Sequence, residues 1–78
     1  MKLGIETVEA LQKISSKYKG KIIEKIDGIT IELTWNENTA CYIFLPNKLL
    51  PSNDENKDKV IAYHITKLAK TLSELVEN

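Results

Sequence analysis

Arginine is absent from this chain of 78 residues, and all eleven basic residues are lysine. Arginine is the side chain that binds phosphate and guanine in a bidentate manner, so its absence weighs against specific nucleic-acid recognition. Eleven acidic residues balance the lysines, and a net charge of zero gives no general attraction to nucleic acids or acidic membranes. We therefore expect a partner other than a nucleic acid or a membrane.

Cysteine, glycine and long apolar runs are scarce as well. Cys41 is the single cysteine, which excludes an intramolecular disulfide and is typical of a reducing compartment. The glycines at positions 4, 20 and 28 are isolated, so no glycine-rich phosphate loop is present. No stretch approaches the ~20 apolar residues of a membrane span, and Glu6 and Glu9 interrupt the beginning before any run of signal-peptide length. We expect a cytoplasmic domain.

The residues that could carry chemistry lack the neighbours that such chemistry requires. His64 has no cysteine or carboxylate at metal-ligand spacing, and Cys41 has no visible base beside it. Asp54, Glu55 and Asp58 lack the spacing of a calcium loop and suit the acidic first turn of a helix. We therefore expect no catalytic residue, no metal and no cofactor, and a protein that is not an enzyme.

The most regular pattern runs from about Asp54 to Glu77. Its apolar residues recur every three or four positions, which places them in one stripe along an amphipathic helix roughly 35 Å long. The stripe consists of Ile61, Ile65, Leu68, Leu72 and Leu75. Residues 5–19 show a second helical pattern, and Gly20 is suited to end it in the left-handed conformation.

Two strands follow, Lys21–Ile26 and Ile29–Trp35, joined by Asp27-Gly28. An Asp-Gly pair between β-branched runs predicts a hairpin with a type I′ turn, which needs positive φ at both central residues. In that register one face of the hairpin is apolar and is the face that the helices cover. It comprises Ile22, Ile26, Ile29, Ile31, Leu33 and Trp35, with Glu24 as the misfit that must lie at an edge.

Ala40–Leu45 is a third strand that is apolar on both faces and ends at Pro46. A three-residue loop before it would turn Cys41, Ile43 and Leu45 toward the core. A loop of two or four residues would instead turn Ala40, Tyr42 and Phe44 inward. The sequence leaves both registers open.

The expected fold is a single α+β domain of residues 1–78 in the order helix, strand, strand, strand, helix. Its architecture is a two-layer sandwich, a three-stranded antiparallel meander with both helices on one face. This element order is similar to that of the double-stranded-RNA-binding domain. The loop Asp27-Gly28 is shorter than in RNA-binding members, and the second helix begins with Asp54-Glu55 instead of a lysine cluster. No functional residue is carried over from that resemblance.

The predicted apolar surface exceeds what the predicted core can cover. A six-residue strand spans about 20 Å, so the last helix should overhang the sheet. Exposed apolar patches usually mark interaction sites. We expect a small regulator, inhibitor or adaptor that binds another protein or a second copy of itself, by analogy with the small inhibitors of phages and mobile elements. The expected partner-binding residues are Tyr42, Ile43 and Phe44 on the third strand, with Leu72, Leu75 and Val76 on the overhang.

A second interpretation uses the uneven distribution of charge. Residues 13–26 contain five lysines and a single acid. A weak nucleic-acid-binding domain, similar to the double-stranded-RNA-binding class, would use this basic patch. Its residues would be Lys13, Lys17, Lys21 and Lys25.

Overall fold

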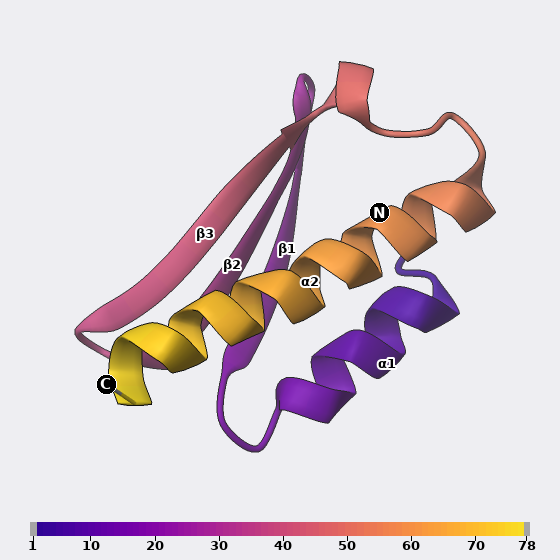
Figure 1. The fold of residues 1–78 in the computed structure, drawn as a ribbon. Coiled ribbons are helices and arrows are strands. Elements are labelled where there is room, and N and C mark those ends of the chain that lie inside the picture. The colour runs from indigo at the N-terminus through magenta and orange to yellow at the C-terminus, as the bar shows by residue number, and fades with distance from the viewer. Residues whose placement is uncertain (1, 78) are drawn as a thin grey trace.

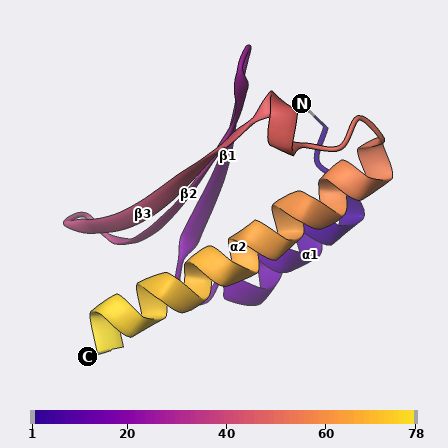
Figure 2. The ribbon, with the colours of Figure 1, turned by 45° about the horizontal axis from the view of Figure 1, so that its top comes forward.

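The computed structural model describes residues 2–77 as one open antiparallel sheet with two helices. Figure 1 and Figure 2 show both helices side by side on one face of the sheet, running in the same direction. The expected α+β arrangement is thereby confirmed. The elements are α1 (Ile5–Ile14), β1 (Lys19–Lys25), β2 (Gly28–Asn36), β3 (Thr39–Pro46), the 3-10 turn η1 (Asn47–Leu49) and α2 (Asp54–Glu77).

The core lies between the helices and the sheet face that they cover, which we call the covered face. β2 is the central strand, and its Ile31 and Leu33 have no exposed surface. Ile61, Ile65 and Leu72 of α2 are buried against them, as the predicted stripe requires. Burying a large aliphatic side chain stabilises the fold by about 1.5–3 kcal/mol, so this contact holds the two layers together.

The first helix is shorter than predicted. α1 ends at Ile14, a turn follows, and Lys19 and Gly20 belong to β1. Gly20 pairs with Leu33 in the sheet, so it does not end the helix. Tyr18, which follows this turn, is buried beside Leu33 and Leu72.

The β1–β2 hairpin differs from the prediction by two residues of register. Lys25 pairs with Gly28, so the turn residues are Ile26 and Asp27, and no residue described has a positive φ. Gly28 is a strand residue instead, paired with Lys25 and Pro46. Glycine suits this position because a Cβ there would overlap the main-chain oxygen of Leu45 and the ring of Phe44. Ile26 is consequently 98% exposed, and its predicted place on the covered face is wrong.

A β-bulge between Thr34 and Asn36 decides the register of β3. The loop Glu37-Asn38 has two residues. The extra residue Trp35 in β2 shifts the pairing by one residue and so exchanges the two faces toward which the side chains of β3 point. Trp35 is 43% exposed at this bulge and does not join the core, contrary to the prediction. The result equals the three-residue alternative, in which the covered face of β3 presents Cys41, Ile43 and Leu45.

Candidate interaction surface

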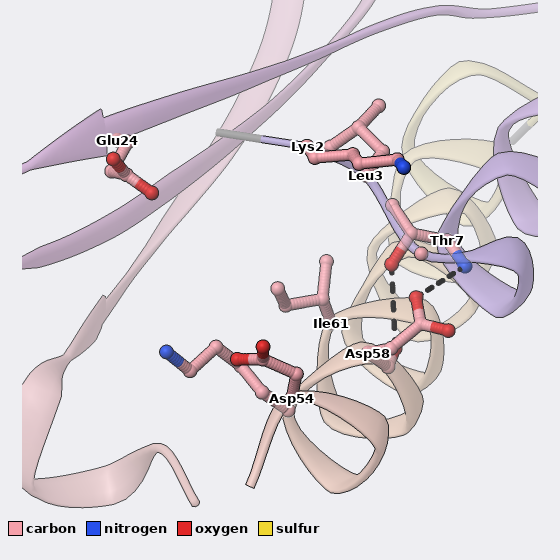
Figure 3. A pocket seen from close by; sticks show the side chains of 9 residues that line it. Lys2, Leu3, Thr7, Glu24, Asp54, Asp58 and Ile61 are labelled. Atoms are coloured by element: carbon pink, nitrogen blue, oxygen red, sulfur yellow. Dashed lines mark hydrogen bonds between the residues drawn. The ribbon is translucent and has the colours of Figure 1, made fainter. Parts of the chain in front are cut away.

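A hollow of about 430 Å³ lies between the beginning of α1, β1 and the first turns of α2 (Figure 3). Acidic and basic side chains line it, so it is the first place to look for chemistry. The charged residues around it are Lys2, Glu24, Asp54, Lys57 and Asp58.

Asp58 in this hollow is bonded to the beginning of α1. Its Oδ2 accepts the backbone N–H of Glu6 and its Oδ1 that of Thr7, both at 2.9 Å, while the Thr7 hydroxyl donates to the main-chain oxygen of Asp58 at 3.3 Å. Gly4 stands at the N-cap of α1 and provides no side-chain cap. Asp58 therefore caps α1 from the neighbouring helix, because the first N–H groups of a helix otherwise lack partners.

The environment of Asp58 keeps its carboxylate charged. Burial raises the pKa of Asp58, but the hydrogen bonds from Thr7 and Glu6 outweigh burial and leave the pKa below its usual value. A Cβ on Gly4 would overlap this carboxylate, so glycine is required there for close approach. Both oxygens are occupied by backbone groups, and this part of the hollow serves the fold.

We call the opposite face of the sheet the outer face, and no helix or strand of residues 2–77 covers it (Figure 2). Strand pairing arranges it in rows that cross the sheet, since directly paired residues share a face. Ile23, Thr30 and Phe44 form one row, and Lys21, Glu32 and Tyr42 form the next. The rows beyond them are Lys25, Gly28 and Pro46 on one side, and Lys19, Thr34 and Ala40 on the other.

The outer face thus has an aromatic strand and a basic strand. Tyr42 is 72% and Phe44 40% exposed on β3. Lys19, Lys21 and Lys25 are exposed on β1, about 10 Å across the sheet from the aromatic rings. Glu32 lies between them on β2 as the acidic residue of the face.

Of the six residues expected to bind a partner, Tyr42 and Phe44 lie together on the outer face. Ile43 points to the covered face and is half-buried. Leu72 has no exposed surface, so the expectation that it overhangs the sheet is wrong. Leu75 is exposed at the end of α2, and Val76 packs against the buried group of Tyr18, Leu33, Ala69 and Leu72.

The four lysines of the nucleic-acid interpretation are divided between the two layers. Lys21 and Lys25 lie on the outer face, whereas Lys13 lies beside a hollow between the two helices. Lys17 donates to the hydroxyl of Ser73 at 3.5 Å and lies 5.6 Å from the centre of the Tyr18 ring. These four lysines do not form one patch.

Lys19 is a residue of the outer face that the sequence prediction misses, because the helical pattern over residues 5–19 includes it. The signal was present: Lys19, Lys21, Ile23 and Lys25 alternate with period two. Asp54 and Asp58 line the same hollow, whereas His64 lines another and Cys41 lies on β3. Among residues 2–77 no group of three His, Cys, Asp or Glu side chains could hold a metal ion.

Within the described part of the chain, neither helix combines the length and the apolar character needed to cross a membrane. Comparison with protein-family models, with curated proteins and with solved structures finds no match for this chain.

Proposed function

We propose that this chain is a non-enzymatic protein-binding module, a small regulator, inhibitor or adaptor that binds its partner with the outer face of the sheet. The observation that supports it most is the exposure of Tyr42 and Phe44 on a face that no helix or strand of the described chain covers. Aromatic side chains are enriched at protein interfaces, where a rigid ring adds contact area at small entropic cost.

The charges of the outer face favour a partner with an apolar centre and an acidic rim. Three lysines of β1 border the face, against Glu32 on β2. Opposite charges on a partner would steer the encounter and fix its orientation, while Ile23, Tyr42 and Phe44 would supply the apolar contact.

A single-stranded nucleic acid is the competing occupant, because aromatic rings and lysines on a sheet face also suit stacked bases and phosphates. Glu32 disfavours it. This carboxylate lies in the same row as Lys21 and Tyr42, between them, where it would repel a backbone that followed the lysines. The lack of arginine removes bidentate phosphate contacts as well.

We place this activity in the cytoplasm. The one cysteine, Cys41, is free and half-buried in β3. A fold without disulfides suits a reducing compartment.

Capture from nuclease-treated lysate of the cells that make this chain tests the proposal. The wild type is compared with the double variant Tyr42→Thr/Phe44→Thr, in which threonine keeps the preference for a strand. We expect proteins that bind the wild type and are lost with the variant, because the apolar contact is gone.

Tyr63→Gln is the matched control, because Tyr63 is also a strongly exposed tyrosine, 61% exposed, but lies on α2. It should capture the same proteins as the wild type. Capture that is unchanged by Tyr42→Thr/Phe44→Thr would contradict the proposal. So would a wild type that holds only nucleic acid in untreated lysate and releases it steeply as salt rises.

A further inference from the structure

The two free edges of the sheet have opposite chemistry. Four of the seven residues of β1 are charged, whereas none of the eight residues of β3 is. Natural proteins protect edge strands from pairing with other chains by placing charges there, lysine above all, or proline and bulges. β1 is protected in this way by Lys19, Lys21 and Lys25. Pro46 interrupts β3 only at its last residue.

Apolar surface continues around the β3 edge from one face of the sheet to the other. Tyr42 and Phe44 are exposed on the outer face. On the covered face, Ile43 and Leu68 line a hollow of about 120 Å³ together with His64, Lys67 and Thr71 of α2. An added strand at this edge would gain backbone hydrogen bonds from β3 and apolar contacts on both sides.

We propose that a second copy of the chain occupies this edge, with β3 antiparallel to the partner's β3 in a twofold dimer that has one six-stranded sheet. An uncharged strand then pairs with an identical uncharged strand. Pairing through β1 would instead set the three lysines of one strand beside those of the other, which disfavours that edge. The lysine near the β3 edge, Lys67, belongs to α2 and not to the pairing strand. The chain's own β3 has the chemistry that this edge requires.

The alternation of side chains restricts the register of this pairing. In β3 the even-numbered residues point to the outer face and the odd-numbered residues to the covered face. The two outer faces therefore coincide only when even residues pair with even residues and odd with odd, because a shift by one residue exchanges the faces. With Ile43 at the twofold axis, Tyr42 lies beside the partner's Phe44 and Cys41 beside the partner's Leu45. Ile43 and Leu68 of both copies then approach over the two hollows.

The dimer would also extend the outer face. Both copies would present it on the same side, because the twofold axis is perpendicular to the sheet. The purified chain alone should form this dimer, whether or not the outer face also binds another protein.

Light scattering from micromolar to millimolar concentration tests the dimer. We expect the mass of the wild type to rise from 8.9 kDa toward twice that value. Tyr42→Lys places a charge at the edge of β3, at a position that tolerates it because the side chain is exposed. It should raise the dissociation constant about tenfold or more, because the lysine would lie beside the partner's Phe44 and a charge on an edge strand opposes pairing.

Thr30→Lys is the control that separates edge pairing from stacking of two outer faces. Thr30 lies on the outer face but on the central strand, between Ile23 and Phe44. The edge-paired dimer should keep its dissociation constant in Thr30→Lys, while capture of another protein by the outer face should weaken. Dissociation in Thr30→Lys equal to that in Tyr42→Lys would overturn the proposal, and so would a wild type that stays monomeric at millimolar concentration.

Hydrogen exchange of the wild type decides the matter even if Tyr42→Lys fails to fold. We expect amides of β3 to exchange more slowly at high protein concentration, with those of β1 unchanged. Concentration-dependent protection in β1 and none in β3 would contradict pairing through β3.

Discussion

Thr30 and Ile31 are neighbours in β2, yet they belong to two different parts of the molecule. Ile31 points to the covered face and has no exposed surface, whereas Thr30 points to the outer face between Ile23 and Phe44. On the covered side, buried apolar residues and the Asp58 cap join the two helices and the sheet. On the outer side, aromatic and basic residues lie in the open.

This difference separates the buried residues that hold the fold from the exposed residues that our proposal assigns to binding. Substitutions on the covered side should lower the free energy of unfolding and affect binding only through folding. Substitutions on the outer side should weaken binding and change the free energy of unfolding little.

The largest effect is expected for Ile31→Ala. Removing a completely buried isoleucine leaves a cavity, and the free energy of unfolding should fall by about 2–5 kcal/mol. Urea unfolding measures it, with Thr30→Ala as the adjacent control on the outer face. The control should lose less than about 1 kcal/mol. Equal losses in the two variants would contradict the difference between the faces.

A smaller effect is expected for Asp58→Asn. Asparagine keeps one acceptor but opposes a backbone N–H with its own NH₂ group, so the free energy of unfolding at pH 7 should fall by about 1–3 kcal/mol. Asp54→Asn is the control, because Asp54 is exposed in the first turn of α2, one turn before Asp58, and its substitution should cost less than about 1 kcal/mol.

The contribution of Asp58 should depend on pH in a defined direction. Its pKa is lower in the folded chain than in the unfolded one, where it is about 3.9. The stabilisation is therefore complete above that value and is lost as the pH falls through the folded pKa. The difference between wild type and Asp58→Asn should shrink in acid, and a difference that grows there would show that Asp58 does not act through its charge.

The sequence predicted the elements whose patterns are long and regular. The stripe of α2 and the alternation of Ile29, Ile31 and Leu33 each extend over several periods, so one residue that departs from the pattern does not obscure it. Both lie where the sequence predicts them. Of the two registers that the sequence leaves open for the third strand, the structure has the one with Cys41, Ile43 and Leu45 on the covered face, which exposes Tyr42 and Phe44.

The sequence failed where contacts between distant residues decide the geometry. Gly28 suggested a turn, but it lies in β2, where the close approach of Leu45 and Phe44 leaves no room for a Cβ. The bulge at Trp35 has no local signal, although it fixes which side of β3 faces the core. Asp58 caps a helix more than fifty residues earlier in the chain, and no spacing rule connects such distant positions.

The most direct measurement is the free energy of unfolding of Tyr42→Thr at a protein concentration low enough for the wild type to be monomeric. If the outer face is kept for a partner, the loss should stay below about 1 kcal/mol, because the exposed ring of Tyr42 contributes little beyond its cross-strand contacts. A loss as large as that of Ile31→Ala would mean that Tyr42 holds the fold, and would contradict the assignment of the outer face to binding.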